Sequence, residues 1–249
     1  MTDKMIETLA ASLLFALAFI FGPKLHKPGN VRRRSLFSFS AGAAVAYIFV
    51  HLSPELEGAR KVFMEETAHL ASHLAWYSVH VATMLGFVLF YGLDQFVMGL
   101  KPGKEQPHSE EKLGGNKAFW VHVGVLGAYA WLVSYLLVDT LEEGAVPIGL
   151  YAVAMVLHFL TVSHGLHREY GTLYDRKGAW LLAVCSLAGW ASGMLVDFPK
   201  PIVAVLLGLI AGAVIVNTLI GELPREKEGR FFPFVFGAVF YTVLLLISV

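Results

Sequence analysis

Histidine and acidic residues occur inside or at the ends of several long apolar stretches of this sequence. His51 and Glu55 are four residues apart at the end of one stretch, with Pro54 between them. If a helix continues past Pro54, His51 and Glu55 share one face, and an imidazole beside a carboxylate can bind a divalent cation such as zinc. A polar cap on a helix end at the membrane surface explains the pair equally well, so both interpretations stay open.

A second group of candidates lies further along the chain. His158 falls in the middle of an apolar stretch, and His164 and His167 follow at its end. Ionisable side chains inside a membrane are costly and mark candidate functional sites. His158 is therefore a metal ligand or proton carrier, or else a neutral histidine bonded to a neighbouring helix. His164 and His167 could hold one ion, although a polar helix end that reaches the membrane surface is the simpler interpretation.

A third group, Glu66, His69 and His73, has helical spacing in a polar segment of the chain. Two histidines four residues apart suit zinc, but an amphipathic helix lying on the membrane explains the same pattern. No phosphate-binding loop or nucleophile motif accompanies any of the three groups. We therefore expect no enzymatic activity.

The composition indicates that these residues lie in a lipid bilayer. Of the 249 residues, 56% are hydrophobic and only 15% are charged, whereas about 25% are charged in a soluble domain. The net charge of zero gives no reason to expect nucleic acid as a partner. Cys185 is the single cysteine and cannot form an internal disulfide.

Eight apolar segments could each form a transmembrane helix, which needs about 20 mostly apolar residues. They are 5–21, 36–53, 76–99, 118–138, 147–165, 178–197, 201–220 and 231–248. The runs are continuous rather than alternating, which favours helices over a β-barrel. The sequence thus predicts an all-α integral membrane protein with one domain over residues 1–249. The Lys/Glu-rich loop 101–117 is expected to be flexible.

The basic residues predict how the chain crosses the membrane. The loops after spans one, three, five and seven hold 15 of the 19 Lys and Arg residues, and the opposite side has only Lys4, Arg60, Lys61 and Lys200. Because basic loops stay in the cytoplasm, both termini should lie on the non-cytoplasmic side. We expect a multi-pass protein of the plasma membrane.

Spans two and seven carry the same motif. Residues 41–43 and 211–213 both read Ala-Gly-Ala, and in both spans a proline, Pro54 or Pro224, follows the glycine by twelve residues. The two spans cross the bilayer in opposite directions, so the motif predicts an inverted repeat, an arrangement in which transporters place their substrate near the midplane. Chance is the competing explanation, since Ala and Gly abound in membrane helices.

These features together resemble the ZIP family of divalent-metal transporters. The resemblance rests on the stretch 38–56, with His51 and Glu55, and on the stretch 211–224, with Glu222. It implies eight transmembrane helices, both termini outside, and an inverted repeat of helices 1–3 and 6–8 around helices 4 and 5. It covers nearly the whole chain in topology, but its motifs are confined to these two stretches.

The chain departs from this family where the metal ligands should lie. The family carries His-Asn-x-Pro-Asp/Glu-Gly in span four and His-Glu-x-Pro-His-Glu in span five, or close relatives of these. Only His158 survives; the other ligand positions hold Tyr129, Ala130 and Val133 or Ser134 in span four, and Phe159 and Val162 in span five. A shifted match through His164 and His167 needs a different spacing. A dehydrated divalent ion needs anionic oxygens or several imidazoles, which His158 alone does not supply.

The resemblance nevertheless makes a transporter of divalent metal cations, with zinc as the substrate, the leading expectation. The ligands expected along its path are His158 at the midplane, His51 and Glu55 near the outer entrance, and His164, His167 and Glu222 at the inner exit. The expected partners are the metal ion and the lipid bilayer, and a homodimer is left open.

The alternative is a ZIP-like membrane protein that does not transport and has a binding, regulatory or structural role. The aromatic side chains of span four, Tyr129, Trp131 and Tyr135, favour this alternative because they could fill the space where a metal path would run. An intramembrane metalloenzyme is a remote third possibility, since no general base accompanies a metal motif.

Overall fold

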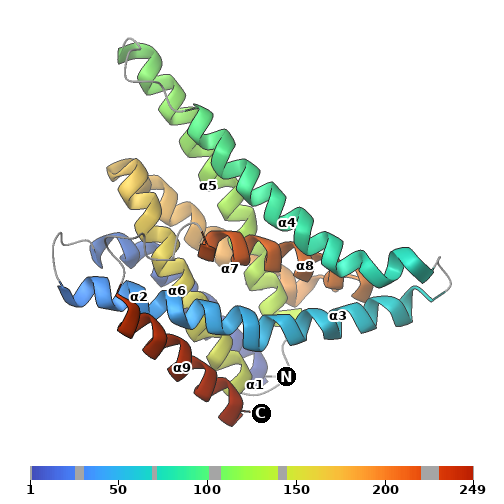
Figure 1. Ribbon diagram of the computed structural model, residues 1–249. Coiled ribbons are helices and arrows are strands. Elements are labelled where there is room, and N and C mark those ends of the chain that lie inside the picture. The colour runs from blue at the N-terminus through green and yellow to red at the C-terminus, as the bar shows by residue number, and fades with distance from the viewer. Residues whose placement is uncertain are drawn as a thin grey trace.

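The computed structural model describes residues 2–25, 31–68, 72–100, 108–139, 145–219 and 230–248, and all regular structure within them is helical (Figure 1). The elements in chain order are α1 Thr2–Phe21, η1 Gly22–Leu25, α2 Val31–Ala46, η2 Tyr47–Leu52, α3 Ser53–Glu66, α4 Ser72–Leu100, α5 His108–Asp139, α6 Ala145–Tyr170, η3 Tyr174–Gly178, α7 Ala179–Leu195, α8 Lys200–Asn217 and α9 Phe231–Ser248. Residues 101–107, the start of the expected flexible loop, lie outside the described part. The rest of that loop is helical, because α5 begins at His108.

Seven described helical segments are long and apolar enough to cross a membrane. They are Asp3–Lys24, Ser38–Glu66, Ala75–Gly99, Asn116–Asp139, Ile148–Tyr170, Tyr174–Leu195 and Lys200–Asn217. The apolar helix Phe231–Ile247 is shorter. Helices suit lipid because every backbone N–H and C=O bonds within its own segment. The predicted all-α class is confirmed for the described residues, and the length and apolar composition of these helices suit a multi-pass membrane protein.

The second span extends further than the sequence predicts. The helices α2, η2 and α3 follow one another without a break, whereas the predicted span ended at residue 53. Pro54 lies in the first turn of α3, where a missing N–H is tolerated. The preceding turn is π-helical, and the N–H of Ser53 bonds to the carbonyl of Ile48. The chain therefore accommodates Pro54 by widening one turn instead of ending the helix.

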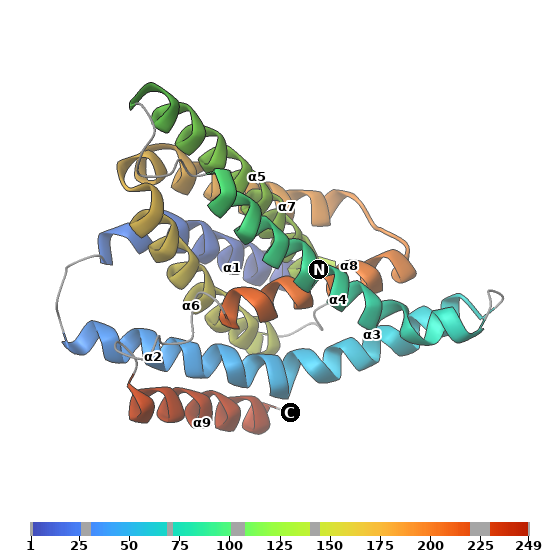
Figure 2. The ribbon, with the colours of Figure 1, turned by 45° about the horizontal axis from the view of Figure 1, so that its top comes forward.

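The helices pack in two groups. In the first group α2 packs mainly on α9 and α4 mainly on α8, and in the second α5 packs on α7 while α1 packs on α6 and α7. Figures 1 and 2 show α9 alongside α2 from both directions. Contacts between the two groups, such as those of α2 with α6 and of α4 with α5, are less extensive.

Two glycines bring α2 and α9 into backbone contact. A Cβ atom added to Gly42 would collide with the carbonyl oxygen of Phe234, and one added to Gly237 would collide with that of Phe39. The backbone N–H of Arg230 also donates to Ser38 Oγ at 3.0 Å. Small residues allow helices to approach in this way, which strengthens van der Waals packing in a membrane.

The helices α4 and α8 meet in the same manner. A Cβ atom added to Gly86 would collide with the carbonyl oxygen of Leu209, and one added to Gly212 would collide with that of Thr83. Gly208 lies one turn earlier on α8 and faces the carbonyl of Val79. Thus in each of these two helix pairs, a glycine on either helix lies against the backbone of the other helix.

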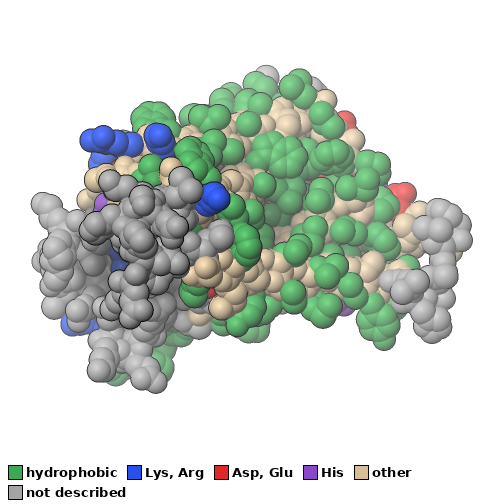
Figure 3. All heavy atoms as spheres, turned by 90° about the horizontal axis from the view of Figure 1, so that it is seen from above, with side chains coloured by type: hydrophobic (Ala, Val, Ile, Leu, Met, Phe, Trp, Pro, Cys, Tyr) green, Lys and Arg blue, Asp and Glu red, His purple; other side chains and the backbone are tan. Residues whose placement is uncertain are grey.

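The charged side chains are distributed unevenly over the molecule. Figure 3 shows Lys and Arg side chains gathered toward one end, acidic side chains toward the other, and hydrophobic side chains over much of the face between them. This distribution agrees with the predicted separation of a basic side from an acidic side.

The glycine contacts predict large effects of a single methyl group. We expect Gly42→Ala and Gly212→Ala each to destabilise the protein by about 1–3 kcal/mol, the usual cost of overpacking. Gly92→Ala is the matched control on α4, because the space around Gly92 is open and alanine favours a helix. Thermal unfolding of the purified protein in detergent measures the difference. Equal midpoints for Gly212→Ala and Gly92→Ala would contradict the prediction.

Candidate functional site

The outermost candidates, His51 and Glu55, lie on the continuous helix that passes Pro54. His51 Nε2 and Glu55 Oε2 are 3.7 Å apart, which is too long for a hydrogen bond. Both atoms are buried, and neither forms a hydrogen bond with another of the described residues. A buried polar atom without a partner is uncommon and calls for an explanation, such as an ion or water that completes its contacts.

Tyrosine side chains from neighbouring helices surround this pair. The ring of Tyr47 lies 5.3 Å from that of His51 and 6.2 Å from that of Tyr151 on α6. Glu55 is close enough to both Tyr47 and Tyr151 to interact with them electrostatically. The hydroxyl of Tyr151 donates to the carbonyl of Val133 at 3.3 Å. The pair therefore lies at the boundary between the two helix groups, with α2 on one side and α6 on the other.

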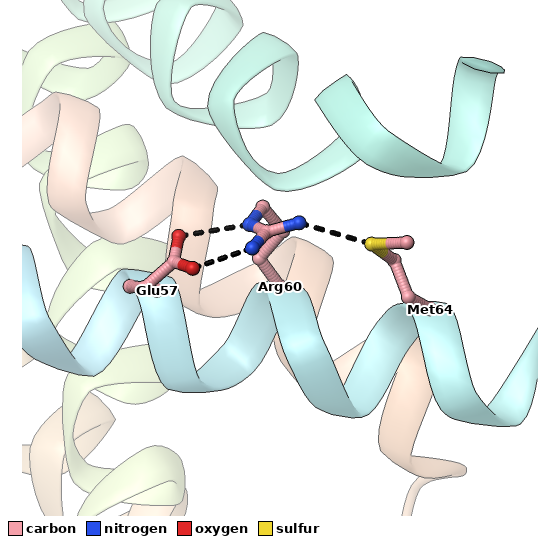
Figure 4. Close-up of polar contacts among 3 residues, drawn as sticks. All are labelled: Glu57, Arg60 and Met64. Carbon is pink, nitrogen blue, oxygen red and sulfur yellow. Dashed lines mark hydrogen bonds and ion pairs between the residues drawn. The ribbon is translucent and has the colours of Figure 1, made fainter. Parts of the chain in front are cut away.

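The turns that follow Pro54 are fixed by Arg60 (Figure 4). Its Nε donates to a carboxylate oxygen of Glu57 at 2.8 Å, and another guanidinium N–H points at Met64 Sδ at 3.0 Å. The guanidinium carbon also lies 4.0 Å from the centre of the Trp76 ring on α4. A cation over an aromatic face is attracted to it, so Arg60 ties α3 to α4 and keeps the helix regular beyond Glu55.

His158, the expected midplane ligand, is almost completely buried, with 1% of its surface exposed. Its Nε2 shares a hydrogen bond of 3.0 Å with the hydroxyl of Tyr129 on α5. The Tyr129 ring packs edge-on against Phe90 and Phe159. This is the arrangement expected of a histidine bonded to a neighbouring helix, and it occupies one of the two ring nitrogens that could bind a metal.

The other aromatic residues of α5 have structural contacts. Trp131 stacks on Tyr135 with the ring centres 5.8 Å apart. The hydroxyl of Tyr135 donates to the carbonyl of Val196 at 3.0 Å and accepts from the N–H of Phe198 at 3.1 Å. These bonds fix the segment between α7 and α8. The aromatic packing predicted for span four is therefore present at Tyr129 and Tyr135.

The inner candidates are held by different partners from those expected. His167 on α6 forms a hydrogen bond of 2.7 Å between its Nδ1 atom and Asp175 Oδ1 in η3. His164, also on α6, is buried. Nearby, His122 Nδ1 lies 3.1 Å from the hydroxyl of Tyr170 and 3.7 Å from Glu169 Oε1. Sequence reasoning missed Asp175 and His122. His122 could have been found, because it precedes Tyr129 by two helical turns on the same face, but no periodicity connects Asp175 to His167.

The end of α8 holds two more buried polar atoms. Asn217 Nδ2 and Thr218 Oγ1 form no hydrogen bond with the described residues, and the helix becomes π-helical at residues 218–219. Glu222, the last expected ligand, lies outside the described residues, as does His69 of the third candidate group. Glu66 of that group is 3.9 Å from Lys200 Nζ.

The candidates do not combine into a metal centre of the usual kind. No three or more His, Cys, Asp or Glu side chains of the described segments lie close enough together to hold a metal ion. The largest set of expected ligands that the structure brings together is the pair His51 and Glu55. Comparison with models of known protein families finds no match, and comparison with curated proteins finds none.

The Tyr129–His158 bond leads to a prediction about stability. Tyr129→Phe keeps the aromatic contacts and removes one hydrogen bond, which should cost about 0.5–1.5 kcal/mol. Tyr77→Phe is the control, because Tyr77 is exposed. Unfolding of Tyr129→Phe, His158→Ala and the double variant in detergent gives the interaction energy of the pair. Additive effects of the two substitutions would show that the residues do not interact.

Proposed function

We propose that this protein is a transporter of divalent metal cations such as zinc, built as an inverted repeat similar to that of the ZIP family. The observation that carries the proposal is the pair of buried atoms His51 Nε2 and Glu55 Oε2, which lie 3.7 Å apart and form no hydrogen bond with the described residues. Two ligands of a tetrahedral zinc ion, each about 2.0 Å from the metal, lie roughly 3.3 Å apart. A small movement of either side chain would allow both to bind one ion.

The glycine contacts support the inverted repeat. Equivalent positions in spans two and seven have one constant separation in sequence: Phe39 and Leu209, Gly42 and Gly212, Pro54 and Pro224. In the structure Gly42 and Phe39 make the same contacts with α9 that Gly212 and Leu209 make with α4.

The partner helices follow the same rule. Phe234 and Gly237 on α9 correspond to Thr83 and Gly86 on α4, again with one constant separation. Five steps along the chain lead from span two to span seven, so the two cross in opposite directions. Matching contacts at four glycines are hard to obtain by chance, and they support the repeat more strongly than the proline motif does.

The two helix groups suggest how a substrate would pass. Less extensive contacts join α1, α5, α6 and α7 to the other helices, so a movement between the groups would disturb few close contacts. His51 and Glu55 lie on one side of this boundary, and Tyr151 and His158 lie on the other. Such a movement could expose a bound ion first to one side of the membrane and then to the other.

In this proposal His51 and Glu55 bind the entering ion, with the Tyr47 and Tyr151 hydroxyls beside them. His158 becomes a ligand once the hydroxyl of Tyr129 leaves its Nε2 atom. His164, His167 and Glu222 would bind the ion near the inner exit, where Asp175 would have to release His167. At His158 and at His167, a metal bond would replace the hydrogen bond to Tyr129 or to Asp175.

Uptake of radioactive zinc into proteoliposomes tests the proposal. We expect Glu55→Gln and His51→Ala to reduce the initial rate at least tenfold, because each removes one of two ligands. Glu65→Gln and His80→Ala are the controls, since both residues are exposed on the adjoining helices α3 and α4. Unchanged uptake by His158→Ala would show that His158 is not a metal ligand on the path. If the unsubstituted protein took up no divalent metal, the proposed transport activity would be contradicted.

A second candidate function is that of a ZIP-like protein with no transport, which binds or supports other components of the membrane. It is favoured by the bond between Tyr129 and His158 and by the aromatic packing around it. This alternative predicts no uptake and no tight zinc binding in detergent by calorimetry. Zinc binding that is weakened by Glu55→Gln would count against it.

A further inference from the structure

The helices α5 and α7 run parallel and in register along their whole contact. Gly127 faces Cys185, and Gly189 and Gly193 face the carbonyls of Trp131 and Tyr135. In all three contacts the residue on α7 follows the residue on α5 by the same number of positions along the chain. The register therefore places the first turns of the α5 span beside η3 and the first turn of α7.

At this end of the contact, both α5 and the segment formed by η3 and α7 carry basic and tryptophan side chains. Lys117 and Trp120 come from α5, and Arg176, Lys177 and Trp180 come from η3 and α7. The ammonium of Lys177 lies 5.9 Å from the centre of the Trp120 ring, so the two elements meet there. Gly178 also lies against the ring of Phe119, which confirms the register at this end.

These side chains are available to a partner. Trp120 and Trp180 are 44% and 57% exposed, and the three basic residues are exposed as well. Among the described carboxylates, none forms an ion pair with Lys117, Arg176 or Lys177; the nearest in sequence, Asp175, bonds to His167. The cluster therefore carries three positive charges that no described carboxylate pairs with.

The position of the cluster relative to the membrane indicates the kind of partner. The candidate spans begin at Asn116 and Tyr174, so the basic residues lie at the level of the lipid headgroups. Beyond them the lipid-facing surface is apolar, with Val121 and Val184 exposed. Tryptophan favours this interface, and basic pockets between membrane helices bind anionic headgroups.

We propose that Lys117, Arg176 and Lys177, together with Trp120 and Trp180, form a binding site for an anionic phospholipid. The phosphate-bearing headgroup would lie among the basic side chains, and the acyl chains would follow the exposed apolar side chains of α5 and α7, such as Val121 and Val184. Charge complementarity selects the anionic lipid over a zwitterionic one. The site is independent of metal transport.

Fluorescence quenching by brominated lipids tests the site in detergent–lipid micelles. We expect brominated phosphatidylglycerol to quench the tryptophan fluorescence at a lower lipid concentration than brominated phosphatidylcholine. Lys117→Gln/Lys177→Gln should raise the concentration needed for half-quenching by phosphatidylglycerol roughly 25-fold, because each lysine contributes about fivefold. Trp120→Phe/Trp180→Phe should remove the preference for phosphatidylglycerol, and Trp76 at the other end of the molecule remains as a reporter of unselective quenching.

The matched control is Lys24→Gln/Arg230→Gln, which removes two exposed basic residues from the same side of the protein but from other helices. It should leave the half-quenching concentration within about twofold. Equal quenching by the two lipids, or an equal loss in both double variants, would overturn the proposal. Displacement of the lipid by millimolar inorganic phosphate would also overturn it, because the site would then bind free phosphate.

Discussion

The close approach of helix backbones at four glycines is the constraint on which the rest of this structure depends. In lipid no hydrophobic effect drives helices together, so association depends on van der Waals packing and hydrogen bonds. Gly42 and Gly237 allow α2 and α9 to touch along their backbones, and Gly86 and Gly212 do the same for α4 and α8. These two pairs form a frame that holds the helix bearing His51 and Glu55.

The candidate chemistry lies at the edge of this frame. The Tyr47 ring on η2 contacts Tyr151 on α6, so the environment of Glu55 depends on how the two helix groups sit against each other. The continuous helix through Pro54, held by Arg60 against α4, keeps the carboxylate in position on one side. A proposed site at such a boundary is sensitive to movement, whereas a site within one group would move as a rigid body.

Hydrogen bonding distinguishes the histidines from one another. His158 and His167 have hydrogen-bond partners, Tyr129 and Asp175. His51 Nε2 and Glu55 Oε2 are buried and form no hydrogen bond within the described part of the chain, and burying a polar atom without a hydrogen bond costs free energy. His51 and Glu55 are therefore the stronger candidates for binding an ion. The sequence favoured His158 instead, because it lies in the middle of an apolar stretch.

The sequence by itself determined the membrane environment, the helical class and the approximate spans, because long apolar runs and the basic loops reflect the bilayer directly. It also predicted the shared face of His51 and Glu55, since a helical period is local. Only the tertiary structure decided that Tyr129 forms a hydrogen bond with His158, that Asp175 forms one with His167, and how far the helix continues past Pro54. Those outcomes depend on which helices become neighbours, and residues distant in the chain determine that.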